Sequence, residues 1–157
     1  QDRITRLSSG VAIVKVGANS EVELIEKRHR IEDALEAVNS AQQEGIVLGG
    51  GMTLMRVSEA LNIEFDNEEQ ATALAIIKKA LLAPFNTMAS NAGHNPEVLR
   101  INMGECEDME GYNFLTNKKE DLFRSGVIDP AKVTRCSVKN AVSVAGTLLL
   151  TNHSIVH

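Results

Sequence analysis

Aromatic side chains are scarce in this chain of 157 residues, at 3% of the sequence, with one Tyr and no Trp. Hydrophobic residues nevertheless make up 43%, which is enough for a packed core and excludes wholesale disorder. We therefore expect one ordinary domain, or a small domain with an appendage, whose core is built from aliphatic side chains and methionine. The charged fraction of 24% is the usual globular share and does not indicate a coiled coil.

An excess of basic residues is also missing. Sixteen Lys and Arg stand against 21 Asp and Glu, which gives a formal net charge of −5. Nucleic acids and anionic membrane surfaces attract basic faces, so we expect neither as a partner. No apolar run approaches the length of a membrane span, and the first residues show no cleavable signal pattern.

Metal-binding patterns are absent from the sequence. The two cysteines, Cys106 and Cys136, lie far apart and in no metal-ligand spacing, which is typical of buried thiols in a reducing compartment. The four histidines are scattered without a ligand-spaced pair, so we interpret them as solvated or structural. The sequence therefore predicts no metal ligands of its own.

Periodicity and capping residues predict a mainly α protein with a few short strands. A composition change near Gly45 separates a charged, elongated arm from a compact helical body. Pro84 is expected to break or kink its helix, and Asp129 is expected to cap the last helix, with Pro130 as the first helical residue. Helices are predicted over 1–9, 52–61 and 120–124, and a buried strand over 11–16. Further helices are predicted from a Ser20-x-x-Glu23 capping box to residue 44, from an Asp66 cap to residue 82 with the pattern resuming to 91, from Asn95-Pro96, and from the Asp129 cap to about residue 150.

Three consecutive glycines, Gly49, Gly50 and Gly51, stand at the start of a predicted helix. Backbone without Cβ atoms approaches a ligand closely, and the N–H groups of a helix N-terminus favour an anion, typically phosphate. A tight connection or close helix packing explains the same glycines without a ligand. The pattern is neither a GxGxxG nor a Walker motif, so both interpretations stay open.

Two aspartates are candidates for chemistry. Asp33 lies inside the long predicted helix, at the edge of an apolar face that includes Ile31 and Leu35. It is either a solvent-facing charge or a carboxylate that orients the attacking water in phosphate-ester hydrolysis. Asp129 is explained by its expected capping role alone.

Five motifs in this order resemble group I chaperonins, the bacterial GroEL class. Residues 10–18 read GVAIVKVGA, like a strand of that family, and residues 31–37 read IEDALEA, where the family has V-E-D-A-L-x-A. Residues 43–51 read QEGIVLGGG, residues 111–113 read GYN, and residues 126–135 read GVIDPAKVTR, each close to a family motif. Any one motif is weak, but five collinear motifs at compatible spacing are highly specific.

The resemblance covers only the last part of a family subunit and implies a division of the chain. Residues 1–10 resemble the end of the apical domain, and residues 11–44 resemble the intermediate-domain arm. Residues 45–157 resemble the second half of the equatorial, ATP-binding domain. The implied fold is thus a multihelical, equatorial-like body with a helical arm, and the chain is expected to be a segment of a longer polypeptide.

The resemblance also implies site residues and ligands. Asp33 resembles the catalytic Asp that activates the water attacking the γ-phosphate of ATP. Gly50, with Gly49 and Gly51 beside it, resembles the nucleotide contact, and Asp129 resembles the carboxylate that accepts from the ribose hydroxyls. ATP or ADP is the implied ligand, with Mg held mostly by residues outside this chain. The implied adenine pocket is formed by Asn113, Phe114 and Val127.

The implied function is that of an ATP-dependent molecular chaperonin that assists protein folding. Its implied partners are a homo-oligomeric ring, unfolded client proteins and a possible co-chaperonin lid, in a bacterial-type cytoplasm or an organelle matrix. The chain alone is expected to be inactive as an ATPase. Phe114 and Leu115 depart from the small residues usual in the family, which narrows or reshapes the expected adenine pocket.

Two other hypotheses remain. The helical body is an assembly module without its own ATPase activity, with apolar residues near its C-terminal end exposed for association. Alternatively, the triple glycine belongs to a small phosphate-binding protein.

Overall fold

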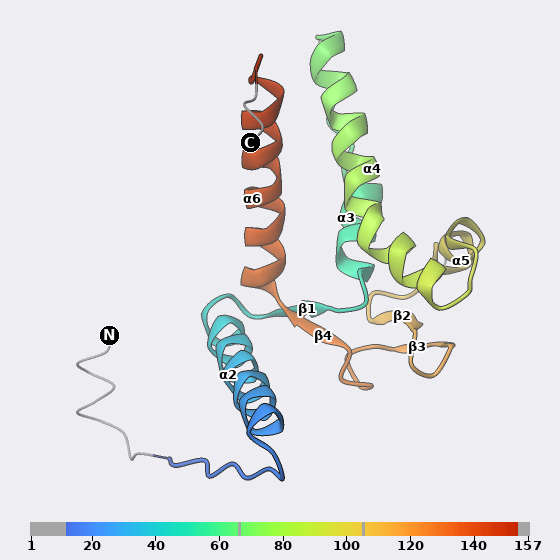
Figure 1. Cartoon of the computed structure of the whole chain (residues 1–157). Coiled ribbons are helices and arrows are strands. Elements are labelled where there is room, and N and C mark those ends of the chain that lie inside the picture. The colour runs from blue at the N-terminus through green and yellow to red at the C-terminus, as the bar shows by residue number, and fades with distance from the viewer. Residues whose placement is uncertain (1–11, 66, 105, 154–157) are drawn as a thin grey trace. The chain divides into compact units, whose positions relative to one another are not determined.

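A computed structural model describes residues 12–65, 67–104 and 106–153, and it is mainly helical with a few short strands (Figure 1). The predicted fold class is therefore confirmed. The chain forms two compact units, Gln1–Val38 and Asn39–His157, and each is considered by itself. The division of the sequence into three domain segments stays a prediction, and the helix expected over 1–9 lies outside the described residues. No helix among the described residues is both long and apolar enough to cross a membrane.

The long predicted helix is α2, Glu21–Glu44, and its start is fixed by a capping box. The backbone N–H of Glu23 donates to Ser20 Oγ at 3.3 Å, and the Glu23 carboxylate accepts from the backbone N–H of Asn19 at 3.1 Å. No residue of α2 is buried. Ion pairs one turn apart, such as Lys27–Glu23 at 2.8 Å, therefore support the helix locally.

The strand predicted over 11–16 is wrong in its described part. Residues 12–18 form neither helix nor strand, and the side chains of Ile13 and Val14 are exposed. A strand needs a neighbour that accepts and donates its backbone hydrogen bonds. The described residues place no such neighbour beside this segment, so a β-branched run alone does not make a strand.

The core lies in the second unit, where three helices meet a hairpin. The helices are α3 (Met52–Ala60), α4 (Glu68–Asn91) and α5 (Pro96–Met103), each of which was predicted. The core is less aliphatic than expected, because one Phe and the single Tyr belong to it. Its buried members are Met52, Met55, Phe85, Ala89, Leu99, Met103, Tyr112 and Leu122.

Pro84 lies inside α4, and the helix continues past it to Asn91. Figure 1 shows the axis of α4 changing direction along its length, as a proline in a helix interior requires. The predicted kink is thus confirmed, and the alternative of a break is wrong. The start of α4 is capped by Asn67, whose side chain accepts from the backbone N–H of Glu69 at 2.8 Å. The predicted cap, Asp66, lies outside the described residues.

Two short antiparallel pairs of strands complete the second unit. β1 (Ile46–Leu48) pairs with β4 (Ile128–Pro130), and β2 (Glu110–Asn113) pairs with β3 (Lys118–Asp121) as a hairpin. The helix predicted over 120–124 is wrong, because Glu120 and Asp121 belong to β3 and turns follow them. Pairing with β2 decides the conformation there, and no local pattern carries that information.

The last helix, α6, runs from Ala131 to Leu149 and begins one residue later than predicted. Pro130, not Asp129, is the residue at the N-cap position, and no side chain caps the helix. Asp129 lies instead in β4, opposite Val47. The capping explanation of Asp129 is therefore wrong, and helix capping does not explain why a carboxylate stands at this position.

Candidate functional site

Packing explains two of the three glycines in the turn that joins β1 to α3. The backbone N–H of Gly49 donates to the carbonyl O of Val127 at 2.9 Å, and a Cβ on Gly49 would lie 3.2 Å from that carbonyl. A Cβ on Gly51 would lie 2.9 Å from the backbone N of Phe85, and its φ of +74° disfavours other residues. Gly49 and Gly51 thus allow the turn to approach β4 and α4 closely.

Gly50 differs from its two neighbours because a Cβ there would make only ordinary contacts. The atoms nearest to a Cβ built there are the carbonyl O of Tyr112 at 3.6 Å and Val127 Cγ1 at 3.9 Å, both at ordinary contact distance. Its φ of +65° still favours glycine. Of the three glycines, Gly50 is therefore the one where an added Cβ would be crowded least.

A cavity of about 460 Å³ opens beside this turn, and both Gly50 and Asp129 line it. The size falls in the range of pockets that hold small molecules. Most of its wall is apolar, with Leu54, Pro84, Met88 and Val133 among its lining residues.

The polar groups of this cavity differ in whether they are already engaged. The hydroxyl of Thr53 donates to the carbonyl O of Leu48 at 2.8 Å, and that of Thr134 donates to the carbonyl O of Pro130 at 3.4 Å. Asp129 is exposed and makes no side-chain hydrogen bond or ion pair within the described residues. A carboxylate acceptor beside a glycine turn and an apolar wall suits a ligand with an apolar ring and hydroxyl groups, such as a nucleoside.

Asn113 and Phe114 do not line this cavity, because both are engaged in the hairpin and the core. The Asn113 amide donates to Glu120 Oε1 at 2.5 Å, and its oxygen accepts from the backbone N–H of Leu115 at 2.9 Å. The same amide holds the pKa of Glu120 below its ordinary value. The ring of Phe114 lies 5.8 Å from that of Phe85, centroid to centroid.

The structure therefore brings together some of the predicted nucleotide residues and not others. Gly50, Gly51 and Asp129 share one cavity, and the Val127 side chain lies against Gly50. The carbonyl O of Tyr112 lies beside Gly50, and Asn113 is the next residue of β2. The predicted adenine pocket therefore adjoins the glycine turn through the β2–β3 hairpin.

The end of α2 is tied to the start of α6 within the second unit. Arg135 forms a two-pronged ion pair with the Glu44 carboxylate, with N–O distances of 2.9 and 2.6 Å. The backbone N–H of Ala131 donates to the carbonyl O of Gly45 at 3.0 Å. Hydrogen bonding to Arg135 is the main cause that lowers the pKa of Glu44. This pair was not predicted, because its members lie 91 positions apart in the sequence and no local pattern links them.

Asp33 is exposed on α2 in the first unit, and its predicted catalytic role stays a prediction. His94 has a structural role in the second unit: its Nε2 lies 3.1 Å from the Tyr112 hydroxyl and 3.1 Å from Asn117 Oδ1. Among the described residues, no three His, Cys, Asp or Glu side chains gather in a way that suits a metal ion. Cys106 and Cys136 are both free thiols and half-buried.

The chain belongs to the TCP-1/cpn60 chaperonin family, whose family model matches residues 3–157. The fold agrees with this: a solved structure described as "Crystal structure of group III chaperonin in the open state" matches 89% of the chain with a TM-score of 0.75 and 32% identity. That match covers 30% of the solved chain. The predicted equatorial-like fold is thus confirmed.

Two curated relatives are chloroplast-type group I chaperonins, which confirms the predicted resemblance to that class. The RuBisCO large subunit-binding protein subunit beta-1 of Chlamydomonas reinhardtii is 48% identical over 155 residues, which cover 96% of this chain and 36% of the relative. The chaperonin 60 subunit beta 1, chloroplastic, of Arabidopsis thaliana is 44% identical over 99% of this chain and 26% of the relative. The chain therefore spans about a quarter to a third of these relatives.

Proposed function

We propose that this chain is the nucleotide-binding C-terminal part of a group I chaperonin subunit that assists protein folding at the expense of ATP. Family membership supports the chaperonin role in general. The observation that carries the nucleotide role is that Gly50 and the unengaged carboxylate of Asp129 line one cavity of about 460 Å³. An organelle matrix is the setting we favour, because a chloroplastic chaperonin is among the relatives of this chain.

Each residue has a defined task in the proposed binding mode. The Asp129 carboxylate accepts hydrogen bonds from the two ribose hydroxyls, and a hydrogen bond to a charged acceptor contributes about 1.5–3 kcal/mol. The backbone of Gly50 lies close to the sugar without a Cβ in the way. On the hairpin side of the turn, the groups nearest to Gly50 are the Val127 side chain and the carbonyl O of Tyr112.

Asp33 supplies the hydrolytic step in the proposed function. Its carboxylate accepts a proton from a water molecule while the water oxygen attacks the γ-phosphorus. The bond between that phosphorus and the bridging oxygen of ADP breaks, so that ADP and inorganic phosphate leave. Magnesium, when bound, neutralises charge on the phosphates. The described residues offer no cluster of ligands for it, so no step is assigned to metal ligands of this chain.

Calorimetric titration of the chain with ATP, adenosine and inorganic phosphate tests the nucleotide role. We expect adenosine and ATP to bind, and Asp129→Asn to weaken both about tenfold or more, since one lost charged acceptor exceeds 1.4 kcal/mol. Asp108→Asn is the matched control, because Asp108 is an exposed carboxylate outside this cavity. Equal binding by wild type and Asp129→Asn would contradict the proposal.

Turnover tests the hydrolytic role separately. We expect the chain alone to hydrolyse ATP far more slowly than an intact chaperonin. In the intact subunit, Asp33→Asn should abolish turnover while leaving nucleotide affinity unchanged. Phosphate binding by the chain without adenosine binding, lost in Gly50→Val, would favour the phosphate-binding alternative instead.

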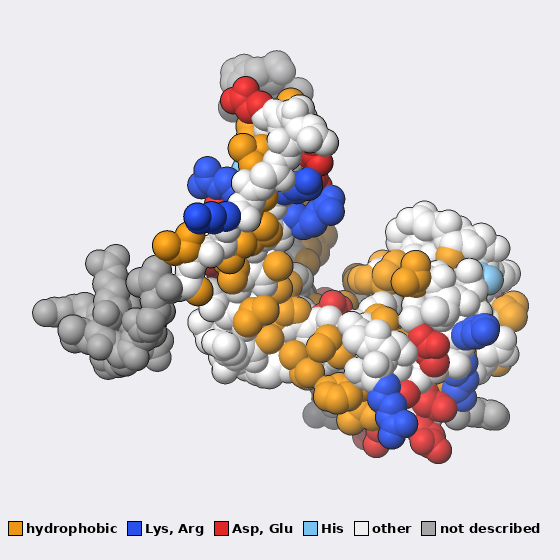
Figure 2. Space-filling model, turned by 90° about the horizontal axis from the view of Figure 1, so that it is seen from below, with side chains coloured by type: hydrophobic (Ala, Val, Ile, Leu, Met, Phe, Trp, Pro, Cys, Tyr) orange, Lys and Arg blue, Asp and Glu red, His pale blue; other side chains and the backbone are white. Residues whose placement is uncertain are grey.

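A role as an assembly module is the second candidate, and the surface of α6 favours it. Val144, Leu148 and Leu149 are exposed in the last half of this helix. Figure 2, a view from below, shows further groups of apolar side chains on the face that it presents. Exposed apolar surface is typical of interaction sites. Association that depends on chain concentration and not on ATP would support this candidate.

A further inference from the structure

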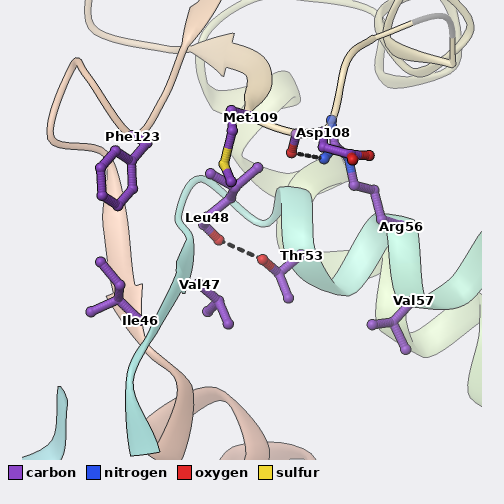
Figure 3. Close-up of a pocket in the computed structure, with 9 residues that line it drawn as sticks. All are labelled: Ile46, Val47, Leu48, Thr53, Arg56, Val57, Asp108, Met109 and Phe123. Carbon is purple, nitrogen blue, oxygen red and sulfur yellow. Dashed lines mark hydrogen bonds between the residues drawn. The ribbon is translucent and has the colours of Figure 1, made fainter. Parts of the chain in front are cut away.

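Arg56 has no task in the proposed function, yet it is the most highly connected side chain near the glycine turn. It lies in α3, and its guanidinium donates to three backbone carbonyls of the segment that leads into β2. Nη2 lies 2.6 Å from the carbonyl O of Glu107 and 2.8 Å from that of Glu110, and Nη1 donates to the carbonyl O of Asp108. Figure 3 shows Arg56 reaching from α3 toward Asp108.

The three carbonyls converge because residues 107–110 form a tight turn. The backbone N–H of Glu110 donates to the carbonyl O of Glu107 at 3.0 Å, which closes the turn. The planar guanidinium carries five donors in a fixed fork and can serve several acceptors at once, whereas a lysine ammonium is a point charge. In the part of the chain that the structure describes, no other side-chain hydrogen bond joins this turn to α3.

A second side chain of α3, Thr53, binds the end of β1, the strand that leads into the glycine turn. Its hydroxyl donates to the carbonyl O of Leu48, the last residue of β1, at 2.8 Å (Figure 3). Thr53 and Arg56 are three residues apart and thus lie on the same side of the helix. One helix therefore fixes both the strand that enters the glycine turn and the segment that leads into β2.

Core packing and Arg56 constrain different parts of β2. A Cβ on Gly111 would lie 2.5 Å from Leu122 Cδ1, so the middle of the strand is pressed against the core. Glu110, at its start, is held by Arg56. Strands advance about 3.3 Å per residue, so roughly 10 Å of strand, with Gly111 packed inside it, separates Glu110 from Asn113. Tyr112, between them, carries the carbonyl that lies against Gly50.

We propose that Arg56 is a positioning residue for the nucleoside part of the site. It fixes the start of β2 and thereby sets the distance between Gly50 and Tyr112, whose carbonyl O lies beside that glycine. The claim about the nucleoside rests on the proposed function, whereas the claim about β2 does not.

Two variants and a control test this inference in the full chain. Arg56→Met removes the donors and keeps a long apolar stem, and Arg56→Lys keeps the charge without the fork. Arg124→Met is the matched control, because Arg124 is an exposed arginine that makes no bond to the described residues 107–110; its ion pair is with Asp121, the last residue of β3, at 3.4 Å. The ligands are ATP and tripolyphosphate, which lacks the nucleoside, and hydrogen exchange reports on the amides of residues 111–113.

We expect Arg56→Met to weaken ATP binding about tenfold, because a displaced β2 should weaken the contacts to the nucleoside. The contacts to the phosphates should not change. Binding of tripolyphosphate should change less than about twofold in the same variant. Amide exchange at 111–113 should accelerate while exchange in α4 stays unchanged. Arg56→Lys should behave like Arg56→Met, and Arg124→Met should behave like the wild type.

Several outcomes would overturn the inference. Unchanged exchange at 111–113 in Arg56→Met would show that packing alone positions β2. An equal loss of ATP and tripolyphosphate binding would show a general loss of folded protein, and full rescue by Lys would show that only charge matters. If wild-type chain binds no ATP, the proposed function and the nucleoside claim both fail, and the exchange measurement still decides whether Arg56 fixes β2.

Discussion

Two regions of residues 39–157 use their apolar side chains in different ways. The helices α3 to α5 and the β2–β3 hairpin bury a continuous cluster centred on Phe85 and Met52, both fully buried. The helix α6 also carries an apolar stripe, yet none of its residues is buried, and Leu149 is 86% exposed. Periodicity therefore shows which face of a helix is apolar, and it does not show whether this chain supplies a partner for that face.

The two regions also differ in what holds them. Side chains from three helices and a hairpin interlock in the first region, whereas α6 is held mainly at its beginning. The contacts there are the β1–β4 pairing, the bond from Ala131 to Gly45 and the ion pair between Arg135 and Glu44. Cavities lined by Ile77 and Leu81 on one side and Val138 on the other separate the rest of α6 from α4.

Removing the largest buried side chain should break the first region. Phe85→Ala is expected to lower the free energy of unfolding by about 3–5 kcal/mol, because it removes a buried ring and leaves a cavity. Urea unfolding followed by circular dichroism measures this. Phe123→Ala is the matched control, since that ring is 54% exposed, and it should cost far less. Equal losses in the two variants would contradict the assignment of the core.

The glycine turn offers a second, smaller contrast. Gly51→Ala is expected to cost about 2–3 kcal/mol, because it combines left-handed backbone with a Cβ 2.9 Å from the backbone N of Phe85. Gly93→Ala has a similar φ, +80°, and nothing within 4 Å of the added atom, so it should cost only about 1 kcal/mol. Thermal and urea unfolding compare the two, and equal effects would show that backbone strain alone, not close packing, requires Gly51.

The ion pair between Arg135 and Glu44, which holds the start of α6, should make the stability of the chain depend on pH. Arg135 lowers the pKa of Glu44 below its ordinary value of 4.5 in the folded chain. The resulting stabilisation is fully present above the pKa of the unfolded chain and is lost as the pH falls through the folded pKa. We therefore expect Arg135→Ala to reduce the loss of stability between about pH 5 and pH 3. Arg124→Ala, which leaves Glu44 untouched, is the control, and an unchanged acid profile in Arg135→Ala would contradict this role of the ion pair.

Local signals predicted the helices well. The capping box at Ser20, the Asn95-Pro96 start of α5 and the kink at Pro84 each depend on residues within a few positions, so the sequence contains what decides them. The strand over 11–16 and the helix over 120–124 were wrong because pairing between segments decides both. The cap of α6 was predicted one residue too early for the same reason, because Asp129 lies in β4 and pairs with β1.

The candidate site was predicted in part. Motif resemblance located Gly50 and Asp129, and the structure places both at one cavity. Sequence reasoning did not find that Asn113 is engaged by Glu120, nor that Arg56 holds the carbonyls of residues 107–110. The first interaction depends on the register of the hairpin and the second on tertiary packing, and the spacing of residue types predicts neither.

The smallest expected effect concerns the exposed end of α6 and sharpens the opening contrast. Leu149→Gln should change the free energy of unfolding by less than about 0.5 kcal/mol, because the side chain contacts little of this chain. Sedimentation velocity over a range of concentrations should nevertheless show weaker self-association than in the wild type if the apolar face of α6 serves assembly. A matched change on the same helix, Asn140→Gln, should alter neither measurement. A large loss of stability in Leu149→Gln would mean that α6 packs against its own chain, and the contrast between the two regions would then be wrong.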